Sequence, residues 1–246
     1  SKGKWCWVSP LPQGNTLRAV WGTSATDYFL AGLRGTMLRR DGKTTVAMQT
    51  GTQQDLHALW GSGPADVFAV GAGGTIIRFN GKTWSAMSSG VTETLTGVWG
   101  ASSMAVFAVG HSGTLLRFDG VKWSKVSAGT TANLSGVWGP SATEVYVVGA
   151  GGLIGRLSAA TGWSAMQSNT TKHLYSVWGT SGKNIYAGGD KVLLQFTGAQ
   201  WGTVKLTTAL TDSAHAIWGS GPNDVHVAMG HQMLRFDGKG WTMVSG

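Results

Sequence analysis

The stretch that decides the fold runs from Leu56 to Trp84: Leu-His-Ala-Leu-Trp-Gly-Ser-Gly-Pro-Ala-Asp-Val-Phe-Ala-Val-Gly-Ala-Gly-Gly-Thr-Ile-Ile-Arg-Phe-Asn-Gly-Lys-Thr-Trp. Close copies of it occur six times, and each copy carries a Trp-Gly pair. The tryptophans of these pairs stand 39, 39, 39, 40 and 40 residues apart: Trp21, Trp60, Trp99, Trp138, Trp178 and Trp218. A period of this length is that of one blade of a β-propeller.

Each copy is expected to contain four short strands bounded by turn residues. In the second copy we predict strands over residues 56–60, 67–70, 75–79 and 84–87. The third and fourth strands are joined by Asp-Gly or Asn-Gly, as in Asn80-Gly81, which suits a type I′ hairpin. Such repeats cannot bury both faces alone, so they stack radially. We therefore predict an all-β, six-bladed β-propeller with four antiparallel strands per blade, forming one closed domain over residues 1–246.

The composition agrees with a single ring and excludes several kinds of site and segment. Only 12% of the 246 residues are charged, whereas 39 are glycine and 13 are tryptophan. The one cysteine, Cys6, excludes an internal disulfide and a zinc site built on several thiolates. No apolar run reaches the roughly 18 residues of a membrane helix, so no membrane span is expected. We expect an extracellular or periplasmic protein whose signal peptide is not part of this chain.

The net charge of +8 does not by itself indicate a nucleic-acid-binding protein. An arginine recurs at one position in the third strand of five repeats, and Gln195 fills that position once: Arg39, Arg78, Arg117, Arg156 and Arg235. A side chain that every blade repeats is typical of structure. A carboxylate that opens the second strand in four repeats can either accept backbone N–H bonds or meet this arginine. We therefore predict no specific binding to DNA or RNA.

The ends of the chain raise the question of how the ring closes. Residues 4–9, around Trp5, match the fourth strands of the later repeats, such as the one at Trp84, but lack three strands of their own. Either this segment or the one at Trp241 should complete blade six. The repeated tryptophans are expected to be mostly buried between blades, whereas Trp7 lies outside the pattern and is a candidate exposed ring.

Candidate binding residues are polar positions that vary between repeats. In the first strand, Arg18, His57 and His215 share one position, and if blades six, one and two are neighbours they form a basic arc at the channel. Further candidates lie in the loops before the first strand and in the turns after the second strand: Asp55, Glu93, Asn133, His173, Asp212, His111 and His231. Histidines without a nearby carboxylate pattern do not predict a metal site. Because no catalytic constellation can be placed, we expect neither an enzyme nor a cofactor.

The Trp-Gly pairs, the Asp-Val-Phe-Ala-Val-Gly second strand and the Asp-Gly-x-x-Trp turn resemble those of tectonin- and tachylectin-like β-propellers, which occur in bacteria and animals. The chain is also similar, more loosely, to the Asp-box repeats of sialidases and photosystem assembly factors, because Gly120 directly follows Asp119 and the initial serine is missing. The first resemblance implies a multivalent lectin that binds glycans of cell surfaces or glycoproteins between and above the blades. The second implies a protein-interaction or assembly scaffold without sugar binding. An enzyme using the channel is a third class, and it would need a cluster of acids that the sequence does not contain.

Overall fold

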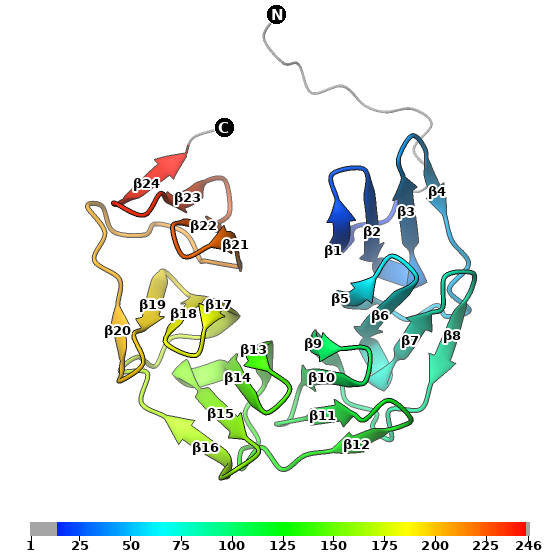
Figure 1. Ribbon diagram of the computed structural model, residues 1–246, viewed down its shortest axis with the longest axis horizontal. Coiled ribbons are helices and arrows are strands. Elements are labelled where there is room, and N and C mark those ends of the chain that lie inside the picture. The colour runs from blue at the N-terminus through cyan, green and yellow to red at the C-terminus, as the bar shows by residue number, and fades with distance from the viewer. Residues whose placement is uncertain (1–13, 245–246) are drawn as a thin grey trace, which may run out of the picture.

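The computed structural model describes residues 14–244, which form six antiparallel sheets of four strands each. Figure 1 shows the sheets arranged as the blades of a propeller, with the first strand of each blade innermost and the fourth outermost. The predicted six-bladed, all-β fold is confirmed. Among the described residues, no helix is long and apolar enough to cross a bilayer.

The blades follow one another along the chain. Blade 1 contains β1 (Leu17–Ser24), β2 (Asp27–Gly32), β3 (Met37–Asp41) and β4 (Thr45–Ala47); blade 2 contains β5 (Leu56–Gly63), β6 (Asp66–Gly71), β7 (Ile76–Phe79) and β8 (Trp84–Met87); blade 3 contains β9 (Leu95–Ser102), β10 (Ala105–Gly110), β11 (Leu115–Phe118) and β12 (Trp123–Lys125). Blade 4 contains β13 (Leu134–Ser141), β14 (Glu144–Gly149), β15 (Ile154–Ser158) and β16 (Gly162–Met166); blade 5 contains β17 (Leu174–Ser181), β18 (Asn184–Gly189), β19 (Val192–Phe196) and β20 (Trp201–Thr203); blade 6 contains β21 (Ala216–Gly221), β22 (Asp224–Ala228), β23 (Met233–Phe236) and β24 (Trp241–Val244). Three single 3-10 turns join second and third strands: η1 (Leu33–Gly35), η2 (Ala72–Gly74) and η3 (Ala150–Gly152).

The turn between the third and fourth strands differs from the predicted type I′ hairpin. A type I′ turn needs positive φ at both central residues, but here only the glycine has it, with φ of 91° at Gly81. The side chain of Asn80 instead accepts hydrogen bonds from the backbone N–H groups of Lys82 and Thr83, at 3.0 and 2.9 Å. The connection is therefore a four-residue loop held by an Asn or Asp side chain, not a two-residue hairpin.

The hydrophobic core is divided among the interfaces between successive blades. Phe68, Val70 and Ile76 of blade 2 are buried against Leu95 and Val98 of blade 3, and the same arrangement recurs at the other interfaces. The Trp-Gly pairs belong to this packing. The tryptophan of one blade lies over the glycine of the next: a Cβ atom built on Gly61, Gly100, Gly139, Gly179 or Gly219 would lie 2.6 to 3.2 Å from the preceding tryptophan ring.

The tryptophans are less uniformly buried than predicted. In the fourth strands, Trp84, Trp123 and Trp201 are buried. Those at the ends of the first strands in blades 1 to 5 are half-buried. Trp218 in blade 6 is 61% exposed. Trp7 lies outside the described residues.

The predicted closed ring is not found among residues 14–244. Each inner strand packs against the inner strand of the next blade, from β1 to β21. Figure 1 shows an opening between β21 and β1, so blades 6 and 1 do not meet. The strand that completes blade 6 is β24, with Trp241 paired to Phe236, and the alternative strand around Trp5 lies outside the described residues.

Candidate binding surface on the inner rim

Six residues at equivalent positions on the inner strands define the inner rim of the propeller: Arg18, His57, Thr96, Ser135, Tyr175 and His215. The pairing of Leu56 with Gly71 places the loop before each first strand beside the turn after the second strand, at the same end of the blade. The inner rim and these loops therefore share one end of the molecule, which we call the loop face. All ten residues predicted to bind a ligand lie on this face, but the structure divides them into groups with different contacts.

The best-organised group on the rim centres on Tyr175. Its ring stacks on His173, with centroids 4.6 Å apart and an interplanar angle of 18°, and lies 5.1 Å from the ring of His215. The Tyr175 hydroxyl donates a hydrogen bond to Asp190 at 2.6 Å, and the Ser213 hydroxyl donates to the same carboxylate oxygen. We call His173, Tyr175 and His215 the Tyr175 cluster.

The Tyr175 cluster joins three blades. The Nε2 atom of His173 lies 2.8 Å from the Ser135 hydroxyl in blade 4, whereas His215 belongs to blade 6. The hydrogen bond from Tyr175 lowers the pKa of Asp190. The same bond raises the pKa of Tyr175, because the hydroxyl would lose the bond if it ionised. Asp190 is therefore an anion and Tyr175 a neutral donor at neutral pH. The rings are held in fixed positions while the outer face of His215 remains exposed.

The second rim group is the pair of Arg18 and His57. The Arg18 Nη1 atom lies 3.4 Å from the His57 Nδ1 atom. Burial, followed by the charge of Arg18, lowers the pKa of His57, so the ring is neutral at neutral pH and can accept a hydrogen bond from the guanidinium. Arg18 itself is exposed.

The predicted basic arc of Arg18, His57 and His215 does not form. It required blades 6 and 1 to be neighbours, and Figure 1 shows them on opposite sides of the opening. Arg18 and His57 do meet, but His215 packs against Tyr175 instead. The rim therefore carries two separate polar groups, the Tyr175 cluster with its neighbouring rings and the pair of Arg18 and His57.

Two of the predicted ligand-binding residues stabilise turns. The Asp55 carboxylate accepts a hydrogen bond from the backbone N–H of Arg34 at 2.9 Å, and the Asn133 amide oxygen accepts one from the N–H of Ser112 at 3.0 Å. Arg34 and Ser112 both have positive φ, of 55° and 53°, a conformation that costs free energy for residues other than glycine. Asp55 and Asn133 thus hold the turn of the preceding blade.

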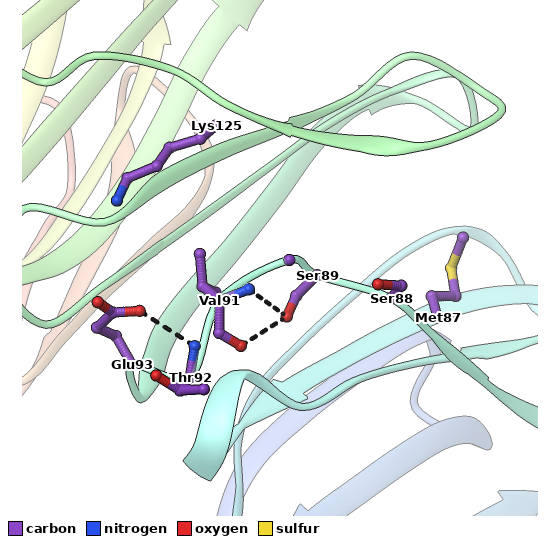
Figure 2. Close-up of a pocket in the computed structure, with 8 residues that line it drawn as sticks. Met87, Ser88, Ser89, Val91, Thr92, Glu93 and Lys125 are labelled. Carbon is purple, nitrogen blue, oxygen red and sulfur yellow. Dashed lines mark hydrogen bonds between the residues drawn. The ribbon is translucent and has the colours of Figure 1, made fainter.

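Glu93 belongs to a different feature, a groove between the outer parts of blades 2 and 3. Figure 2 shows the groove with residues 87–93 on one side and Lys125 of β12 on the other. The Glu93 carboxylate and the Lys125 amino group lie at the same end of it. Much of its polar lining is internally bonded, since Glu93 accepts from the N–H of Thr92 and the Ser89 hydroxyl donates to the carbonyl of Val91.

The remaining predicted residues do not gather into a site. His111 and His231 are exposed on turns of blades 3 and 6. Asp212 lies beside Gly230, where a Cβ atom would come 3.2 Å from its carboxylate. Among residues 14–244, no three His, Cys, Asp or Glu side chains lie close enough together to hold a metal ion.

The end opposite the loop face is structural, as the repeated arginines predicted. In four blades the arginine of the third strand pairs with the acid that opens the second strand: Arg39 with Asp27, Arg78 with Asp66, Arg156 with Glu144 and Arg235 with Asp224. In the first two of these blades the guanidinium also lies over phenylalanine rings of its own blade and the next. These cations are therefore occupied within the fold.

The sequence reasoning missed the residues that organise the rim. Tyr175 occupies the variable position that it shares with Arg18 and His57, so it could have been selected by that position. Ser135 occupies the same position, but its contact with His173 of the next blade has no signal in the sequence. The bond of Asp190 to Tyr175 within blade 5 has none either.

The fold and the rim together define a six-bladed β-propeller with polar and aromatic side chains exposed at one end. No protein-family model matches the chain, and no curated protein sequence matches it. Three similar solved structures are YCF48 bound to D1 peptide, YCF48 from Cyanidioschyzon merolae and the β-propeller domain of Cps50 (Swd1) from Myceliophteria thermophila, each with a TM-score of 0.74. Their sequences are 15%, 17% and 11% identical to this one; the matches cover 95%, 96% and 95% of this chain and 82%, 87% and 88% of theirs.

These neighbours correct the prediction of a multivalent lectin. None of the three is described as a sugar-binding protein, and one is bound to a peptide. The reason for the error is physical as well: Asp55 and Asn133 were predicted to face a glycan, but their side chains are hydrogen-bonded to turns.

Proposed function

We propose that this protein is a protein-interaction scaffold that binds an extended polypeptide segment on its inner rim. The observation that carries the proposal is the Tyr175 cluster, in which Tyr175 stacks on His173 and lies against His215. Tyr175 is held by a hydrogen bond to Asp190 of its own blade, and His173 by one with Ser135 of blade 4. Aromatic residues are enriched in protein interfaces. A surface already held in place loses little conformational entropy when it binds.

The charge of the loop face supports a partner with carboxylate groups. Arg18, Arg34, Lys172 and Lys191 take part in no ion pair found among residues 14–244. Two acids of the same face, Asp55 and Asp190, accept hydrogen bonds from backbone or hydroxyl groups. The cations are therefore available to an acidic partner, and such charges mainly increase the association rate and the selectivity for that partner.

The similar fold of YCF48 bound to D1 peptide supports the class of ligand. At 15% identity it supports neither the same peptide nor the same residues. The prediction for this chain rests on its own rim.

A displayed library of random peptides, selected against the purified chain, tests the proposal. Enriched peptides should contain Asp or Glu, and Tyr175→Ser or His215→Ser should weaken their binding about tenfold or more. The matched control is Val121→Ser, since Val121 is 85% exposed on a turn at the opposite end. Failure to enrich any peptide, or equal binding by the Tyr175 and Val121 variants, would refute the proposal.

A further inference from the structure

The two blade faces that border the opening carry large apolar side chains that the rest of residues 14–244 leaves exposed. In blades 1 to 5 the tryptophan of the first strand packs on the glycine of the next blade. Within the described range 14–244 no blade follows blade 6, and its Trp218 is 61% exposed. On the same blade Met233 and Val244 are each 37% exposed. The face of blade 6 thus keeps the tryptophan of the repeat, although His226 stands where the other blades carry Phe or Tyr. Among residues 14–244 no blade packs on this face.

Blade 1, on the other side of the opening, exposes apolar residues that are buried in the other blades. Val20 is 66% exposed, whereas residues at the same position in the other blades are 7 to 9% exposed: Leu59, Val98, Val137, Val177 and Ile217. Leu17 is 38% exposed, whereas its equivalents are fully buried: Leu56, Leu95, Leu134, Leu174 and Ala214. Both positions face the preceding blade in every other repeat.

We propose that the opening between blades 6 and 1 receives a seventh blade, a four-stranded antiparallel sheet of this same repeat pattern. Its first strand would carry a glycine against which Trp218 packs. Beside this glycine it would carry aliphatic residues, like those that pack near the first-strand tryptophan at the existing interfaces. Its other face would cover Val20 and Leu17 with the tryptophan and the aromatic second-strand residue that blades 1 to 5 present. The five existing interfaces specify this occupant better than any unrelated surface.

The sequence also holds more of the repeat than the six sheets use. Each described sheet has its own fourth strand. Residues 4–9, outside the described part, are a further segment of fourth-strand type. The count of fourth-strand sequences therefore matches seven blades.

A charged residue at the opening also indicates which side chain the seventh blade should carry opposite it. At the position held by Phe79, Phe118, Phe196 or Phe236 in other blades, blade 1 carries Arg40, which pairs with Tyr28 on the same sheet face as Val20. An ordinary blade would place its own third-strand arginine against this position, as Arg78 lies over Phe118. Two guanidinium groups would then repel each other. The seventh blade is therefore expected to carry an acid or an amide there, as blade 5 does with Gln195.

The experiment extends the full chain, after Gly246, with a copy of residues 167–204, which include the four strands of blade 5 and Gln195. We expect the melting temperature to rise by at least about 4 °C, because newly buried apolar surface stabilises the folded state. In oxidative footprinting, Trp218 and Met233 should be oxidised several-fold more slowly. Met104, which is 67% exposed on a turn of blade 3, should be oxidised at an unchanged rate and serves as the internal control.

Two changes show whether the added blade occupies the opening. Residue 195 of the copied blade would lie against Arg40. Gln195→Arg in the copy should therefore remove most of the rise in melting temperature, whereas Gln195→Glu should keep or increase it. Trp218→Ser should also reduce the gain, while Val121→Ser should not. Unchanged oxidation of Trp218, or a gain that survives Gln195→Arg and Trp218→Ser together, would overturn the proposal. So would a stable dimer of the unextended chain in which Trp218 is already protected, since the occupant would then be a second copy. The peptide selection on the inner rim is unaffected by these outcomes.

Discussion

The indole ring of Trp60 lies against Gly100 of the next blade, so closely that a Cβ atom on Gly100 would come 2.6 Å from the ring atom Cη2. Other atoms of the same ring would lie at 2.7 and 2.9 Å. Because the ring is itself packed between two sheets, it cannot move aside without disturbing the core. The glycine of the Trp-Gly pair is therefore required by the tryptophan of the preceding blade, one repeat earlier in the sequence.

This relationship predicts that Gly100→Ala is destabilising. The added methyl group overpacks the interface, and the expected loss of unfolding free energy is about 1 to 3 kcal/mol. Gly202→Ala in β20 is the matched control, because no atom lies within 4 Å of the position of its Cβ. Chemical denaturation of both variants checks the prediction, and equal stability of the two would contradict it.

The paired arginines offer a comparison between neighbouring blades. Arg78 donates to Asp66 at 2.6 Å and lies 4.9 Å from the centre of the Phe68 ring. Arg117 lies 5.9 Å from the Phe107 ring but has no carboxylate partner, because Ala105 occupies that position.

Arg78→Met should therefore cost about 0.5 to 1 kcal/mol more than Arg117→Met, the usual value of a partly exposed ion pair. The difference should shrink in high salt, since ions screen the pair. Urea unfolding at low and high salt measures both effects. A larger loss for Arg117→Met would show that the carboxylate is not what distinguishes the two sites.

The turn that Asn133 holds gives a third prediction. Asn133→Ala leaves the Ser112 N–H without its acceptor while Ser112 keeps its left-handed backbone, so we expect a loss of about 0.5 to 1 kcal/mol. Asn133→Asp keeps an acceptor oxygen in the same place, as Asp55 does for Arg34 in the preceding repeats. Thermal unfolding should rank the aspartate variant close to wild type and the alanine variant below it; the reverse order would argue against this role.

The fold was predictable because its determinants repeat. Trp60 and Gly100 recur at a constant interval, and a period of about 40 residues has few structural solutions. The loop face was less predictable, because a residue such as Asn133 looks the same in a sequence whether it faces a ligand or bonds to a turn. The contact of Tyr175 with His215 depends on which blades are neighbours. The opening was not predicted at all, since six equal repeats suggest a closed ring.

The last prediction concerns the pH dependence of stability, through His57. Burial and the neighbouring Arg18 lower the pKa of His57, and the opposite effect of Asp55 is smaller. A histidine whose pKa is lower in the folded than in the unfolded protein binds its proton more readily after unfolding. Its contribution to stability is therefore fully present above the unfolded pKa of about 6.5 and is lost as the pH falls through the folded value.

His57→Gln should consequently reduce the fall in melting temperature between about pH 7.5 and about pH 5, because glutamine cannot acquire the charge that Arg18 repels. The same mechanism requires that Arg18→Ala raise the pKa of His57 toward its ordinary value, which an NMR titration of the ring protons measures directly. If Arg18→Ala leaves that pKa unchanged, the guanidinium 3.4 Å away does not act on the imidazole. If His57→Gln keeps the acid sensitivity of the wild type, the sensitivity arises from other groups.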